Sequence, residues 1–128
     1  QKNWTLSASR ADVYEREQRM AVETPHVLFY KAGQLSSTLD AQHGSVRMDS
    51  KDMWIGGQLV MESTTGVRLS SDWMNYFHAE QKIVSTAPVV IVRPGSVTHG
   101  QAWEAKPDLS ELVVYNQRVD FDSQAKTP

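Results

Sequence analysis

Residues 83–95 read IVSTAPVVIVRPG, and four consecutive β-branched residues, Val89 to Val92, stand there between two prolines. β-Branched side chains are stiff about χ1 and pack well on the pleated surface of a sheet. The apolar run is too short for a buried helix, and the flanking prolines stop helix growth. The stretch therefore predicts a β-strand over Val89 to Val92 that follows a short break at Pro88.

The pattern recurs at a period of about thirty residues, which is typical of repeated supersecondary units. Windows that start at Thr5, Thr38, Arg68 and Val97 align without a gap. The aligned columns are Leu6, Leu39, Leu69 and Thr98; Ala8, Ala41, Ser71 and Gly100; Met20, Met53, Ile83 and Leu112; and Val27, Val60, Val90 and Val119. Chance alignment of apolar residues in an all-β chain is the alternative, but the absence of insertions within the windows favours four repeated β-hairpin units.

The composition limits the class of protein. A chain of 128 residues with 40% hydrophobic residues has the length of one domain and can bury a core. The net charge of −2 and the lack of basic runs argue against a nucleic-acid partner and a polybasic membrane patch. No cysteine is present, which excludes disulfides and thiolate metal sites. The longest apolar run is too short to span a bilayer.

Turn-forming residues separate short strands at the spacing of a β-sandwich or rolled sheet. Gly56-Gly57 inside a predicted strand indicates a bulge or sharp bend. Residues 11–20 are polar, and we expect strand, turn and strand there rather than a short helix. The prediction is an all-β, rolled antiparallel β-sandwich over residues 1–122 with a C-terminal tail over 123–128. A parallel β-helix is the alternative, although paired strands favour hairpins.

No residue pattern predicts catalysis, a metal or a cofactor. The histidines are scattered without a ligand spacing, at His26, His43, His78 and His99. The sequence has no G-x-S-x-G elbow, and Gly56-Gly57 lacks the lysine and helix start of a phosphate loop. We therefore expect a protein that is not an enzyme.

Apolar residues at alternating positions form the predicted interior. A rolled sheet of hairpins has two open ends, and its interior can be a trough rather than a filled core. Each buried methylene contributes roughly 0.8 kcal/mol, so such a trough can hold a long alkyl chain by apolar area alone. The residues predicted to line it are Leu6, Val27, Phe29, Leu39, Ile55, Val60, Leu69, Ile83, Val90, Val92, Val119 and Phe121. A slip of one residue in register would exchange the two faces of a strand.

Two other functions stay open at this point. The chain could be a structural or adhesive β-repeat module with a filled core. It could also be a sandwich enzyme or sugar-binding β-sandwich whose tryptophans stack on sugar rings. Those tryptophans are Trp4, Trp54, Trp73 and Trp103.

Several segments resemble one family. They are residues 4–11 (WTLSASRA), the Leu39-Asp40-Ala41-x-x-Gly44 echo, residues 66–72 (GVRLSSD) and residues 85–89 (STAPV). Together with apolar positions as far as Val119, they resemble the periplasmic LptC proteins of bacterial lipopolysaccharide export over most of residues 4–122. The related bridge protein LptA shares the repeat, and an LptA-like role stays open.

The resemblance implies a twisted antiparallel β-jelly-roll whose interior receives the acyl chains of lipid A. It implies docking to the inner-membrane lipopolysaccharide export ABC transporter at one end and to an LptA-type bridge protein at the other. It also implies a periplasmic location with a tether to the inner membrane, an N-terminal helix that this chain lacks. Sheet edges at both ends permit strand addition, and they permit a homodimer as well.

Overall fold

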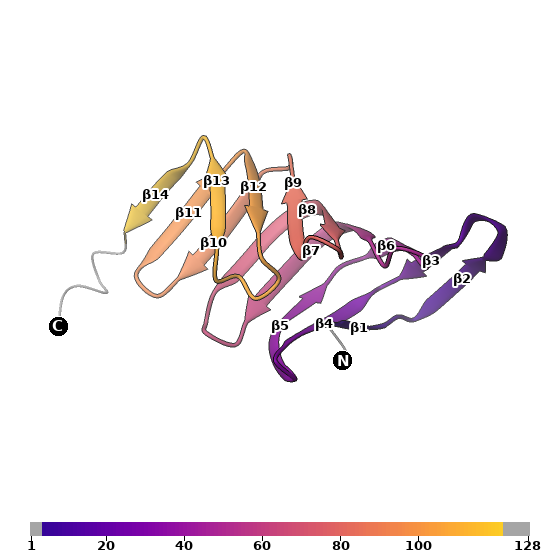
Figure 1. The fold of residues 1–128 in the computed structure, drawn as a ribbon. Coiled ribbons are helices and arrows are strands. Elements are labelled where there is room, and N and C mark those ends of the chain that lie inside the picture. The colour runs from indigo at the N-terminus through magenta and orange to yellow at the C-terminus, as the bar shows by residue number, and fades with distance from the viewer. Residues whose placement is uncertain (1–3, 122–128) are drawn as a thin grey trace.

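The computed structural model describes residues 4–121, which form a 14-stranded, antiparallel arrangement with one 3-10 turn, η1 (Glu15–Glu17). Over these residues no helix combines the length and apolar character needed to cross a membrane. The strands fall into two layers that share β7 and β8 (Figure 1). The N-terminal strands lie at one end of an elongated molecule and the C-terminal strands at the other.

Layer 1 contains, in spatial order, β1 (Trp4–Ser7), β4 (His26–Lys31), β5 (Gln34–Asp40), the second half of β7 (Met53–Ser63), the first half of β8 (Arg68–Phe77), β10 (Val89–Arg93), β11 (Ser96–Gly100) and β14 (Arg118–Phe121). Layer 2 contains β2 (Arg10–Tyr14), β3 (Arg19–Glu23), β6 (His43–Arg47), the first half of β7, the second half of β8, β9 (Lys82–Ser85), β12 (Ala102–Ala105) and β13 (Leu112–Tyr115).

The chain crosses between the layers along one side of the molecule, which we call the crease. The crossings lie at short breaks such as Pro25 and Pro88, or within β7 where the register shifts between Gly56 and Leu59. Backbone hydrogen bonds such as Thr24 N to Gln42 O tie neighbouring crossings together. On the opposite side, which we call the mouth, the hairpin turns of the two layers face each other.

The structure confirms the predicted all-β class and the strand at Val89, which β10 extends to Arg93. Residues 10–23 form strand, turn and strand as expected, with η1 as the turn. The glycine pair marks the irregularity in β7. The antiparallel pairing excludes the parallel β-helix. Four equivalent hairpin units and the domain bounds stay predictions, and residues 123–128 lie outside the described residues.

Candidate functional site

Two rows of side chains run through the interior from one end of the molecule to the other. Cross-strand register places the layer-1 row at Leu6, Val27, Leu39, Met61, Leu69, Ile91, Thr98 and Val119. The layer-2 row consists of Val13, Met20, Val46, Met53, Tyr76, Ile83, Ala105 and Leu112. Both rows are apolar except for Thr98 and the hydroxyl of Tyr76, so the interior offers a continuous apolar stripe.

The centre of this stripe is packed. Phe29 of layer 1 meets Tyr76 of layer 2 edge to face, with 5.3 Å between ring centroids. The indole Nε1 of Trp103 donates across the layers to Ser71 Oγ at 3.1 Å, and Ser71 Oγ donates to Pro88 O at 2.7 Å. Among the described residues every buried side-chain nitrogen or oxygen has a hydrogen-bond partner. The middle of the interior is therefore a closed core rather than an empty trough.

The stripe becomes exposed at both ends. At the N-terminal end, Val13 of layer 2 is 53% exposed. At the C-terminal end, Val119 of layer 1 is 36% exposed and Phe121 is 67% exposed. Each layer thus presents apolar inner surface to solvent where the opposite layer no longer covers it.

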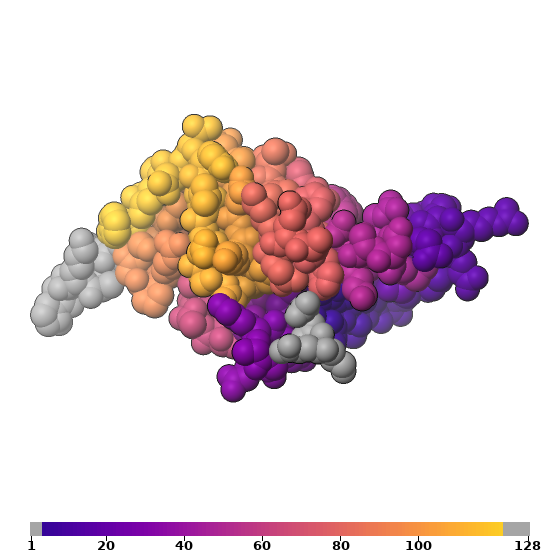
Figure 2. Space-filling model, in the orientation of Figure 1, coloured from indigo at the N-terminus to yellow at the C-terminus, as the bar shows by residue number. Residues whose placement is uncertain are grey.

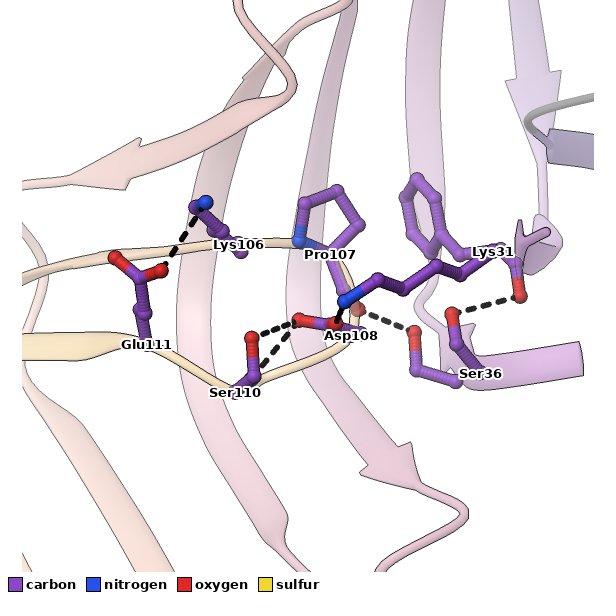
Figure 3. A network of polar contacts seen from close by, with 9 residues as sticks. Lys31, Ser36, Lys106, Pro107, Asp108, Ser110 and Glu111 are labelled. Atoms are coloured by element: carbon purple, nitrogen blue, oxygen red, sulfur yellow. Dashed lines mark hydrogen bonds and ion pairs between the residues drawn. The ribbon is translucent and has the colours of Figure 1, made fainter.

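The mouth is crossed by the loop between β12 and β13, residues 106–111, which we call the strap (Figure 3). Lys31 Nζ of layer 1 lies 2.9 Å from Asp108 Oδ2, and Ser37 Oγ donates to the carbonyl of Pro107. Leu109 of the strap is 4% exposed and belongs to the core cluster. Figure 2 shows the C-terminal strands against the purple segment that contains Lys31.

The charges at the mouth are held in pairs. Burial acts to raise the pKa of Asp108, but hydrogen bonds from Ser110 and Lys31 outweigh it and lower that pKa to about 2. The hydrogen bond to Asp108 in turn raises the pKa of Lys31. At the core side of the mouth, burial raises the pKa of Tyr76 to about 12, so its hydroxyl stays neutral at physiological pH.

Nine of the twelve predicted lining residues lie on the inner face of their strands. They are Leu6, Val27, Phe29, Leu39, Ile55, Leu69, Ile83, Val119 and Phe121. The prediction that Val60, Val90 and Val92 point inward is wrong. Val60 pairs with Asp40, and Val92 is 42% exposed beside the buried Ile91.

Val60 and Val90 were assigned to the wrong face because the crossings between the layers differ in length. In the layer rows, Val27 follows Met20 by seven positions, whereas Met61 follows Met53 and Ile91 follows Ile83 by eight. The ungapped windows assume seven throughout. One additional residue at the bend exchanges the faces of the strand that follows. The valine column therefore mixes two inward and two outward residues.

Sequence reasoning also missed inner residues. Met61 and Ile91 occupy the places assigned to Val60 and Val90, and Gly56-Gly57 was the one local signal of the extra residue in β7. Leu109 had no such signal, because it lies in a turn of polar composition.

The four tryptophans do not form one flat row. Trp103 is buried and Trp4 packs against the core, while Trp54 and Trp73 lie on the outer face of layer 2.

No group of three or more His, Asp or Glu side chains within residues 4–121 is placed to hold a metal ion. His26 Nδ1 lies 2.6 Å from Asp40 Oδ1 on the outer surface, and Tyr76 Oη lies 3.1 Å from His78 Nδ1 near the mouth. Neither pair belongs to a group of that kind. The chemistry available to the interior is therefore apolar contact, with paired charges around the mouth.

Comparison with known proteins agrees with this architecture. A family model described as lipopolysaccharide-assembly, LptC-related, matches residues 1–119. The crystal structure of LptH, the LptA homologous periplasmic component of the lipopolysaccharide transport device from Pseudomonas aeruginosa, has a similar fold with a TM-score of 0.70. The two sequences are 12% identical, and the match covers 93% of each chain. No curated protein matches the chain in sequence.

Proposed function

Because the chain belongs to the LptC-related family of lipopolysaccharide-assembly proteins, we propose that it is a non-catalytic periplasmic transport protein for lipopolysaccharide. In this proposal its interior binds the acyl chains of lipid A, while sugars and phosphates stay outside. Acyl chains need no acid, base or metal for recognition, because binding depends on apolar area.

The observation that supports this proposal most strongly is the pair of apolar rows. Each strand contributes one residue to the row of its own layer, and only Thr98 and the hydroxyl of Tyr76 interrupt the apolar character of the two rows. The stripe is exposed at both ends, as Val13 and Val119 show. An acyl chain can thus make apolar contacts at either end of the stripe, and passage between the ends requires the packed centre to open.

The sheet edges supply the proposed contacts with neighbours. Within the described residues, β1 pairs with β4 alone and β13 pairs with β12 alone, so each terminal region presents a strand edge. Strand addition there would align the stripe with that of an LptA-type bridge protein at one end and the export transporter at the other. The periplasmic membrane tether and a homodimer stay predictions.

A photo-crosslinking amino acid at Phe29 tests lipid binding in cells that export lipopolysaccharide. Phe29 is buried on the inner face of β4, and its neighbour Leu28 points to the other face. The aromatic crosslinker replaces an aromatic ring at Phe29, and Leu28 is the matched control. We expect a lipopolysaccharide adduct from Phe29 and none from Leu28. Adducts from Leu28 without any from Phe29 would refute the proposal.

A specific observation also favours a second candidate, the structural or adhesive module with a filled core. The packed contact of Phe29 with Tyr76 occupies the space that an acyl chain would need. If that packing is permanent, the purified protein takes up no lipid. Mass spectrometry of an organic extract, after incubation with lipopolysaccharide and removal of excess, separates the two: recovered lipid A supports transport.

A further inference from the structure

The strap, which lies near the C-terminal end of the chain, contacts strands β4 and β5 near the N-terminal end. Its ion pair links Asp108 to Lys31, and its carbonyl at Pro107 accepts from Ser37, an inner-face residue of β5. These contacts bridge layer 2 to layer 1 across the mouth (Figure 3). The strap therefore closes the side of the molecule where the two layers could otherwise separate.

Leu109 fills the interior at this place. Its side chain is 4% exposed and belongs to the core cluster that contains Phe29, Leu39 and Tyr76. Its backbone has φ of +60°, a region that leucine rarely adopts. A local conformation of this kind persists when surrounding contacts hold it. Burial of the leucine side chain among apolar neighbours is such a contact, and an alkyl chain could replace it in kind.

Of the two polar contacts that hold the strap, the ion pair is open to solvent, whereas the hydrogen bond from Ser37 to Pro107 is made by a buried residue. The Lys31 side chain is 72% exposed, and ion pairs with so much solvent around one partner are weak. Hollows of about 250 and 360 Å³ flank the Lys31–Asp108 pair. The first is bounded by Tyr30, Gln81 and Pro107, and the second by Gln34, Thr64 and Ser110. The strap thus has space on both sides to move.

We propose that residues 106–111 form a movable strap whose Leu109 occupies an acyl-chain site, and that lipopolysaccharide binding displaces Leu109 and opens the mouth. This inference rests on the proposed function and adds to it the element that must move. It also accounts for a packed centre in a protein that carries lipid: Leu109 takes the place of the ligand until an acyl chain replaces it.

A distance measurement tests the movement directly. Spin labels are placed on Ser110 of the strap and Gln34 of layer 1 through Ser110→Cys and Gln34→Cys, because both residues are exposed and line the same hollow. The control pair is Gln34→Cys with Thr64→Cys, which lie on neighbouring turns of layer 1. We expect lipopolysaccharide to lengthen the Ser110–Gln34 distance and leave the control distance unchanged.

A chemical lock tests whether the movement is required. A bismaleimide joins the cysteines of the Gln34→Cys/Ser110→Cys variant, and uptake of lipopolysaccharide labelled on its sugar is followed by fluorescence. We expect the locked protein to take up lipid at least ten-fold more slowly than the same variant treated with a monofunctional maleimide. The monofunctional reagent controls for modification and for folding of the variant.

The outcomes distinguish a failure of the strap from a failure of the proposed function. Lipid uptake by the locked protein at the control rate, or binding without a change in the Ser110–Gln34 distance, would overturn the strap and leave the transport function intact. Absence of any lipopolysaccharide binding by the wild-type protein would overturn the proposed function and the strap together.

Discussion

Adjacent residues of one strand show how burial assigns roles at the scale of a residue. Ile91 is 1% exposed in the layer-1 row, whereas Val90 points to the outer face of β10. Ile91→Ala removes packed methylenes and leaves a cavity, so we expect a loss of about 2–4 kcal/mol in the free energy of unfolding. Val90→Ala should cost less than about 1 kcal/mol. Urea denaturation measures both, and equal losses would contradict the assignment of faces.

At Gly100, close packing against the neighbouring layer leaves no room for a side chain. A Cβ at this position would lie 2.1 Å from Val114 Cγ1 and 3.2 Å from the carbonyl of Tyr115. Gly100→Ala would press β11 and β13 apart, and we expect a loss of about 1–3 kcal/mol in unfolding free energy. Thermal unfolding of Gly100→Ala, Val114→Ala and the double variant tests this.

The double variant is the informative one, because shortening Val114 makes room for the added methyl group. We expect Gly100→Ala to cost less in the Val114→Ala background than in the wild type. Costs that simply add would show that the alanine is harmful for another reason. The sequence places Gly100 in one column with Ala8, Ala41 and Ser71, which are also small, but the contact with Val114 is apparent only in the tertiary structure.

At the scale of elements, the ion pair of the strap makes the stability of the folded protein depend on pH. The folded-state pKa of Asp108 is about 2, below its ordinary value of 3.8, because Ser110 and Lys31 donate to the carboxylate against the effect of burial. A lowered pKa means that the stabilisation is present above pH 3.8 and is lost as the pH falls through about 2. Since Lys31 is largely exposed, we expect the contribution to be roughly 1 kcal/mol.

Urea denaturation of wild type and Asp108→Asn across this pH range measures the effect. The variant should be less stable at pH 6, and the difference should shrink toward pH 2. Asp49→Asn is the matched control, because Asp49 also has a lowered pKa from its hydrogen bond with Arg47 but belongs to the turn between β6 and β7 and makes no ion pair with the strap. A stability difference for Asp108→Asn that is constant from pH 6 to pH 2 would contradict the ion pair.

Elements were more predictable than their faces. β-Branched runs, proline breaks and turn residues act locally, so β10, β3 and the irregularity in β7 could be predicted from sequence. The number of residues in each crossing depends on how the two layers meet, and that is a tertiary property. For this reason Val60 and Val90 were assigned to the wrong face although their strands were correct. Leu109 depends on long-range contacts of the strap and could not be predicted.

At the scale of the whole molecule, the two apolar rows meet in a packed centre. The ends of the stripe are exposed, the crease is tied by backbone hydrogen bonds, and the strap closes the mouth. Movement at the mouth requires fewer backbone bonds to break than movement at the crease. The architecture therefore favours opening at the mouth, with the crease intact, over separation of the two layers along their whole length.

A ligand that binds this interior must stabilise the folded protein. A ligand at ten times its dissociation constant adds about 1.4 kcal/mol to the free energy of unfolding, which corresponds to roughly 3–6 °C in Tm for a domain of this size. We expect lipopolysaccharide to raise Tm by this amount. The polysaccharide released from the same lipopolysaccharide, which lacks acyl chains, should have no effect. An equal rise with the polysaccharide would identify the sugars as the ligand and would contradict binding through the apolar interior, because the two rows offer sugars few polar partners.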